Sequence, residues 1–466
     1  MAGPTDLLID FGLMSALLVL AQLLRYRMAW LQALQLPAAI VAGLIALALG
    51  PFGLELLPFS LQENGVPQLS TYPSFLIAIV FACVGLARPK GATMTRRKLQ
   101  EVGDTFFYSV ACEVGQYAVA MLFGLLVLSP LFPDLPPGFA IILATGWAGG
   151  HGTAAAVGSV LEAGGWANAL PLAYTSATAG VAFALIGGMS LIHLAIRKGW
   201  TRIVRRPADM PESFRTGFIP AGERGPAGEE TVSAVTIDTL TWHLAIVGSA
   251  TGMAYAVLAA LPSGHGLPLF AFALLTALVL RLVFARARLE TFIDVSTIRR
   301  IGGTATDYLV GFGVASIAVT VVLEYAVPLA LLVLLGMAIT LGQLRFLGPR
   351  MFRSFWFERS LFAFGWNTGV VATGITLVRV VDPEDQSRTL EDFGLAYPAV
   401  SFIEITIVTV LPLLLIRGIV IAPTLVLVAI TVASLVLSRV LLGWSKVPPA
   451  VVRPSEIADQ PELNST

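Results

Sequence analysis

Long apolar stretches separated by short polar segments run along nearly the whole chain. A stretch of about 17–25 apolar residues forms a helix long enough to cross the hydrocarbon core of a membrane. The pattern predicts spanning helices at residues 7–24, 34–50, 73–88, 105–128, 168–196, 240–261, 266–284, 305–323, 327–345, 395–416 and 421–442. The expected fold class is therefore an all-α integral membrane protein.

Two further apolar segments, 138–163 and 359–379, are rich in glycine and do not suit a continuous helix. Thirteen of the twenty-two residues from 144 to 165 are Gly or Ala. Glycine costs a helix about 1 kcal/mol relative to alanine, so such a run predicts broken backbone. Broken backbone at membrane depth is tolerated where protein or a water-filled cavity surrounds it. We interpret both segments as re-entrant hairpins.

Basic residues predict how the helices are threaded, because short cytoplasmic loops collect Lys and Arg. With the N-terminus outside, the turn holding Arg25 and Arg27 and the loop 88–98 fall inside. The basic loop after span 168–196 also falls inside, provided that 138–163 enters and leaves from the outer face. By the same reasoning 359–379 enters from the inner face, and the C-terminus is cytoplasmic.

Five crossings and one hairpin then recur in each half of the chain, in opposite orientation. The expected division is an inverted repeat at 1–196, a cytoplasmic basic loop at 197–238, and a second inverted repeat at 239–418. An additional transmembrane helix at 419–443 and a disordered cytoplasmic tail at 444–466 follow. Inverted repeats with glycine-interrupted segments at matching positions are typical of secondary transporters, whose site opens alternately to either side.

Composition narrows the function classes. Mean hydropathy is +0.82, 12% of residues are charged, and 29 basic residues balance 29 acidic ones, so nothing indicates nucleic-acid binding. Cys83 and Cys112 both lie in apolar windows and form neither a disulfide framework nor a metal motif. No His-Glu-x-x-His run is present, and the segment at 157–160 lacks the second glycine of a serine-protease elbow, so an intramembrane enzyme is not expected. A passive channel stays open as an alternative, although channels seldom need inverted broken helices.

The hairpin tips are the candidate substrate site. Half-helix N-termini favour anions such as carboxylates, whereas free carbonyls and hydroxyls favour a hard cation such as sodium. The candidate substrate-binding residues are Gly149, Gly150, His151, Gly152, Thr153, Asn367, Thr368, Gly369, Thr373 and Arg379. The alternative is that small residues merely let helices pack closely. We favour packing for any single glycine and a site for the two clusters together.

Ionisable residues inside spans call for a functional hypothesis. Glu404 lies in the middle of span 395–416 and is a candidate sodium ligand, together with Thr145 and Ser159 of the first hairpin. The alternative for Glu404 is a carboxylate bound to Ser401, Thr406 or a neighbouring helix.

Three other polar features have two interpretations each. Glu113 and Gln116 share a helix face and either line a cavity or make a polar contact between helices. His151 either donates to a substrate carboxylate or stabilises the hairpin tip. Arg379 binds a substrate carboxylate, or else it pairs with Asp382 or acts as an inner-face anchor.

These motifs resemble one family. The GGHGT run at 149–153, the ILATGW run before it, ACVGLA at 82–87, LPAAIVAG at 36–43 and FIEIT at 402–406 are similar to the bacterial sodium/glutamate symporter family. The family has Ser-Gly-Gly-His-Gly-Thr in its first hairpin, and Ala148 replaces that serine here. The resemblance covers most of residues 7–416 and identifies Glu404 with an acid of the family. The second hairpin departs further: GWNTGVVATG stands where the family has a His-Cys-Gly-Phe-Gly-Leu-Gly-Ala-Thr-Pro run.

The resemblance implies a homodimer in the bacterial inner membrane that couples inward sodium flow to glutamate uptake. It also implies a scaffold domain and a transport domain that bears both hairpins and moves as an elevator. Sodium is the coupling ion and no cofactor is expected. The alternative is a sodium- or proton-coupled carrier of another amino acid or a dicarboxylate.

Overall fold

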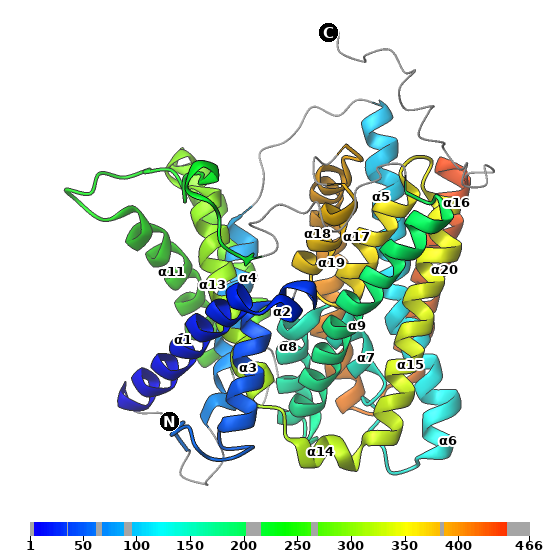
Figure 1. Cartoon of the computed structure of the whole chain (residues 1–466), viewed down its shortest axis with the longest axis horizontal. Helices are drawn as coiled ribbons and strands as arrows, with labels where there is room; N and C mark the ends of the chain where they lie inside the picture. The colour runs from blue at the N-terminus through cyan, green and yellow to red at the C-terminus, as the bar shows by residue number, and fades with distance from the viewer. Residues whose placement is uncertain are drawn as a thin grey trace.

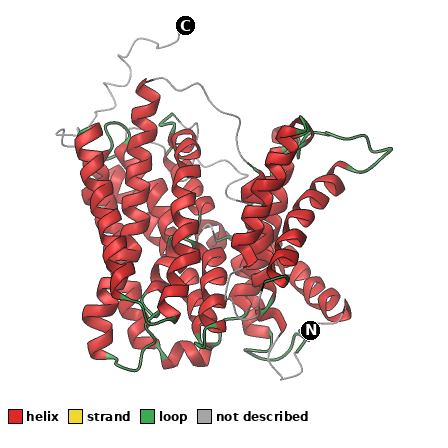
Figure 2. Cartoon of the chain, turned by 180° about the vertical axis from the view of Figure 1, so that it is seen from behind, coloured by secondary structure: helices red, strands yellow, loops and turns green. Residues whose placement is uncertain are grey.

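The computed structural model describes residues 4–34, 36–61, 68–87, 96–201, 216–261, 269–382 and 386–444. Within these ranges the regular structure is helical and no β-strand occurs (Figure 2). Parts of several predicted segments lie outside the described residues: residue 35 of span 34–50, residues 88–95 of span 73–88 and the loop 88–98, 202–215 of the basic loop, 266–268 of span 266–284 and 445–466 of the C-terminal tail.

The helices follow the apolar stretches of the sequence. Those of the first half are α1 (Pro4–Arg27), α2 (Ala29–Leu34), α3 (Ala38–Leu49), α4 (Tyr72–Leu86), α5 (Arg96–Phe123), α6 (Ser129–Leu131), α7 (Ile141–Trp147), α8 (Gly150–Ala163) and α9 (Ala169–Lys198). Those of the second half are α11 (Thr239–Ala259), α12 (Leu269–Arg286), α13 (Val295–Ala315), α14 (Val319–Glu324), α15 (Ala326–Gly342), α16 (Gly348–Met351), α17 (Trp356–Thr368), α18 (Val371–Val381), α19 (Thr389–Ile416) and α20 (Ile421–Leu437).

Eight of the described helical segments are long and apolar enough to cross a membrane. They are 5–27, 100–131, 169–198, 239–259, 269–286, 326–351, 399–416 and 421–442. Two shorter apolar helices, α3 and α4, add to them. The expectation of an all-α integral membrane protein is thereby confirmed.

The helices form two lobes (Figure 1). One lobe contains α1, α3, α4, α11, α12 and α13, with α4 packed against α12 and α13. The other contains α5, α7, α8, α9 and α15 to α20. The lobes meet where α8 contacts α4 and α13 and where α9 contacts α13. Small residues allow this close approach: a Cβ on Gly152 of α8 would lie 2.9 Å from Ile77, and one on Gly313 of α13 would lie 3.0 Å from Tyr174.

Helices α5 and α15, one in each half of the chain, end in the same irregular way. A five-residue π-helix at Gly124–Leu128 extends α5, and another at Gln343–Leu347 extends α15. A short helix with a proline in its first turn follows each, at Pro130 and at Pro349. Proline removes a backbone donor and crowds the carbonyl four residues earlier, and a π-turn accommodates that crowding. Each irregular end stands shortly before a glycine-rich segment.

The predicted span 305–323 is wrong in its position. The helix there, α13, begins at Val295 and ends at Ala315, so Arg299 and Arg300 lie within it rather than in a loop. The helix starts early because the Asp294 side chain accepts hydrogen bonds from the backbone of Ser296 and Thr297, which caps its N-terminus. Both arginines are exposed.

Asp294 also contacts the described part of the basic loop, residues 216–238. The backbone of Glu229 donates to its Oδ2 at 3.2 Å, and its own backbone donates to Nε2 of the buried His243 at 2.8 Å. Desolvation opposes ionisation of this carboxyl, but hydrogen bonds from Thr297, Glu229 and Ser296 hold its pKa below the usual value.

Candidate functional site

The first glycine-rich segment forms two short helices, α7 and α8, that pack against each other. The chain passes between them at Gly149 and Gly150, and Gly150 has a φ of +64°. This left-handed conformation costs a residue with a Cβ roughly 1–2 kcal/mol, whereas glycine adopts it freely. The glycine pair therefore determines where the helix breaks.

The second glycine-rich segment has the same construction. Helices α17 and α18 pack side by side and are separated by Gly369 and the extended Val370. Their close packing depends on glycine, because a Cβ on Gly365 would lie 2.8 Å from the Cα of Gly374. Figure 1 shows α17 and α18 in the upper part of their lobe and α7 and α8 in the lower part.

The breaks of the two segments touch each other. A Cβ on Gly150 would lie 2.6 Å from the carbonyl oxygen of Gly369 and 2.5 Å from Cγ1 of Val370. A Cβ on Gly180 of α9 would lie 2.4 Å from the carbonyl oxygen of Thr368, so α9 supports the same point. Residues more than two hundred positions apart in the sequence thus form one small backbone cluster.

Four helix ends meet at this cluster. Helices α8 and α18 begin there, and α7 and α17 end there. Helix N-termini present free N–H groups with partial positive charge, and C-termini present free carbonyls with partial negative charge. One cluster therefore offers donors to an anion and acceptors to a cation.

The polar side chains of the first tip are buried and contact neighbouring helices. His151 is 1% exposed, and its Nε2 lies 3.1 Å from the Thr178 hydroxyl of α9. This contact fits the interpretation of His151 as a residue that stabilises the tip. Thr153 is also buried and interacts with the carboxyl group of Glu404 on α19.

The polar side chains of the second tip bond mainly within their own helix. Thr368 donates to the Phe364 carbonyl at 2.6 Å, and Asn367 donates through Nδ2 to the Ala363 carbonyl at 2.9 Å. The Asn367 Oδ1 is buried and has no hydrogen-bond partner. Thr373 is buried beside Gly369, with its hydroxyl 3.0 Å from where a Cβ on that glycine would lie.

Helix α5 contacts the second tip directly. Its Gln116, fully buried, donates through Nε2 to the backbone carbonyl of Asn367 at 2.6 Å. This is the polar contact between helices that the sequence left as one of two interpretations. Glu113, one turn earlier on α5, is 1% exposed, and its carboxyl lies close enough to that of Glu404 for their charges to interact.

Three predicted site residues either donate hydrogen bonds within their own helix or lie away from the tip cluster. Thr145 donates to the Ile142 carbonyl, and Ser159 donates to the Ala155 carbonyl, nine residues into α8. Arg379 is exposed near the end of α18, ten residues beyond Gly369. At about 1.5 Å of rise per residue, Ser159 and Arg379 stand on the order of 12–15 Å from the tips. Their roles as ligands stay predictions.

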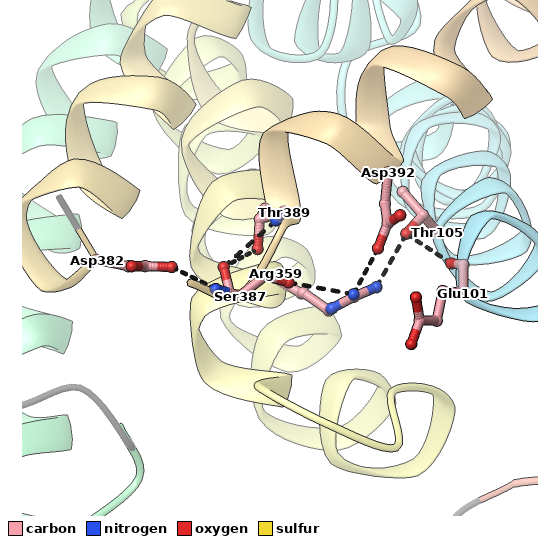
Figure 3. Close-up of polar contacts among 7 residues, drawn as sticks. All are labelled: Glu101, Thr105, Arg359, Asp382, Ser387, Thr389 and Asp392. Carbon is pink, nitrogen blue, oxygen red and sulfur yellow. Dashed lines mark hydrogen bonds and ion pairs between the residues drawn. The ribbon is translucent and has the colours of Figure 1, made fainter. Parts of the chain in front are cut away.

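A buried ion pair that the sequence analysis missed fixes the start of α17, at the end of the second segment away from its tip (Figure 3). Arg359 at the start of α17 bonds to Asp392 at the start of α19, with 2.5 Å between Nη2 and Oδ2. The guanidinium also donates to the Thr105 hydroxyl of α5 and to the Ser387 carbonyl. The sequence analysis gave Arg359 no role, although an arginine at the start of an apolar, glycine-rich segment was the available signal.

The same region contains a polar turn after α18. Asp382, 1% exposed, accepts hydrogen bonds from the backbone of Gln386 and Ser387, as Figure 3 shows for Ser387. The ends of α5, α17, α18 and α19 are thus connected by polar contacts on the side of the lobe opposite the first segment.

A helical multi-pass membrane protein in which two broken helices meet end to end is built like a secondary transporter. The chain belongs to the sodium/glutamate symporter family, because the family model "Sodium/glutamate symporter" matches residues 6–347, well over half of the sequence. The resemblance seen in the GGHGT run is confirmed, and the family is one of transporters rather than enzymes. Comparison with curated proteins and with solved structures found no match. The family match ends at Leu347, before α17.

Proposed function

We propose that this protein is a sodium-coupled secondary active transporter that imports glutamate by alternating access. The observation that carries the proposal is the contact between Gly150 and Gly369, which joins two broken helices in a chain of this family. The N-termini of α8 and α18 would bind the substrate carboxylates, and nearby acceptors would bind sodium. The candidate substrate residues are those of the two tips, from Gly149 to Thr153 and from Asn367 to Thr373.

The two-lobe arrangement supports an elevator motion as part of this proposal. Both broken helices belong to the lobe of α5, and that lobe contacts the other through α8 and α9. Glycines at this contact, Gly152 and Gly313, remove side chains that would otherwise interlock the lobes. The lobe with α4 and α13 would then be the scaffold and would hold a homodimer, with the membrane orientation predicted from the basic loops.

The inverted repeat is supported by the matched helix ends. Residues 124–130 and 343–349 both consist of a π-helix followed by a proline-containing turn, and both precede a broken helix. Labelling of single cysteines tests the orientation, in a background from which the buried Cys83 and Cys112 are removed. We expect residue 151 to react from the outside and residue 368 from the inside in at least part of the transport cycle. Reaction of both from one side only would contradict the inverted arrangement.

The functional test is uptake of radiolabelled L-glutamate into proteoliposomes under an inward sodium gradient, with potassium in place of sodium as the control. We expect sodium-dependent accumulation that excess unlabelled glutamate abolishes. Accumulation of the label that depends on sodium but is not reduced by unlabelled glutamate would contradict the assigned substrate.

A second candidate substrate follows from the limits of the family match. The match ends before α17, so the second tip and Glu404 lie in a part of the chain that the family model does not cover. A sodium- or proton-coupled carrier of another amino acid or a dicarboxylate is therefore the alternative. Competition of aspartate, neutral amino acids and dicarboxylates against labelled glutamate, at two pH values, distinguishes these cases.

A further inference from the structure

Two acidic side chains from different halves of the chain meet beside the hairpin tips. Glu113 lies near the middle of α5 and Glu404 near the middle of α19, and these helices pack against each other. Glu113 is almost fully buried, and Glu404 is partly buried. Two carboxylates whose charges interact in an apolar setting repel each other, and a cation between them removes that repulsion.

The groups that face the pair are neutral. Thr153 of α8 interacts with the Glu404 carboxyl, and the Tyr117 and Tyr397 hydroxyls lie close to both acids. Cys112 adjoins Glu113 on α5. In the described part of the chain these facing groups include no Lys or Arg, and the one nearby histidine, His151, contacts Thr178 instead.

Oxygen atoms without partners gather on this face of α5. Glu113 Oε1, Gln116 Oε1 and the Tyr117 hydroxyl are buried and make no hydrogen bond. The three side chains are 1%, 0% and 1% exposed. Their spacing at positions i, i+3 and i+4 places them on one side of the helix. A buried oxygen without a partner is costly, and a hard cation that prefers oxygen ligands removes that cost.

We propose that a sodium ion binds between Glu113 and Glu404, with Thr153 and Gln116 as neighbouring oxygen ligands. The proposal rests on the proposed function, for which it supplies the coupling-ion site. It differs from the ligands predicted in the first hairpin, Thr145 and Ser159, whose hydroxyls donate to their own helices. Because Thr153 belongs to α8, ion binding would also hold the first tip in place.

The test measures sodium binding without any transported substrate. Purified protein is heated in a series of sodium chloride concentrations, with choline chloride holding the ionic strength constant, and unfolding is followed by tryptophan fluorescence. The sodium concentration at half-maximal stabilisation is compared for the wild type, Glu113→Gln, Glu404→Gln and the control Asp307→Asn. Asp307 is an exposed acid within α13 of the other lobe, so it matches the change in charge without touching the site.

We expect both glutamine variants to raise the half-maximal sodium concentration at least tenfold, and Asp307→Asn to leave it unchanged. If a glutamine variant fails to fold, Glu113→Asp and Glu404→Asp, which keep the charge but shorten the side chain, are compared with the wild type in its place. Equal sodium stabilisation in the wild type and in the variants at both positions would overturn the proposal. Failure of glutamate uptake would leave this result intact, which separates the two proposals.

Discussion

Replacement of Gly150 by alanine tests the contact between the two tips. Its φ of +64° costs alanine roughly 1–2 kcal/mol. The new Cβ would also lie 2.6 Å from the Gly369 oxygen and 2.5 Å from Val370 Cγ1. Overpacking of this kind costs about 1–3 kcal/mol. The arrangement in which the tips touch should therefore lose about 2–5 kcal/mol, which is on the order of a 30- to 4,000-fold change in its population.

The initial rate of uptake and the unfolding temperature are the two measurements for this variant. Gly165→Ala is the matched control, because Gly165 also has a positive φ, +105°, but a Cβ there would meet nothing within 4 Å. The control isolates the backbone cost, so only Gly150→Ala should strongly reduce uptake. If both variants lose stability equally and both transport at the wild-type rate, contact between the tips is not needed for transport.

Three further substitutions probe the contacts around the site. Arg359→Ala removes the buried partner of the Asp392 carboxylate and should destabilise the protein by about 3–5 kcal/mol. In a double-mutant cycle measured by thermal unfolding, the variant with both Arg359→Ala and Asp392→Ala should be less destabilised than the sum of the two single variants. Gln116→Leu removes a buried hydrogen bond to the Asn367 carbonyl and should lower the free energy of unfolding by about 1–3 kcal/mol. A cysteine at position 368 should then react faster with a thiol reagent, and an unchanged rate would contradict a role of Gln116 in holding the second tip. Asp294 has a lowered pKa in the folded protein. Its contribution to stability is therefore complete above the unfolded pKa, near 3.9, and is lost as the pH falls through the lower folded pKa. Asp294→Asn should make the unfolding temperature fall less steeply at acidic pH, and a pH profile identical to that of the wild type would contradict the assignment.

The breaks in both hairpins could be predicted because glycine acts locally. Gly149 and Gly150 weaken the helix whatever surrounds them, and Gly369 does the same in the second segment. The sequence also indicated that Glu113 and Gln116 share a face. It could not indicate which helix that face contacts, since the partner Asn367 lies 251 positions away and no local pattern encodes such a distance.

The errors have equally local causes. Arg299 and Arg300 lowered the apparent hydropathy of α13, so the predicted span began too late, although Asp294 carried a clear capping signal. Arg359 received no role from the sequence, and its buried partner Asp392 lies on another helix. Pairing between helices depends on tertiary packing, which hydropathy does not report.

The contact between Gly150 and Gly369 has a consequence for biosynthesis. The ribosome completes α7 and α8 long before the residues of α17 and α18 exist, so the first hairpin is at first in the membrane without its contact to Gly369 and Val370. The Gln116 amide likewise lacks its acceptor, the Asn367 carbonyl, until the second hairpin has been synthesised. The N-terminal half should thus not mature by itself, and the quality-control proteases of the membrane should degrade a chain truncated before residue 356. Completion of the second hairpin is then the step that commits the nascent chain to its mature form.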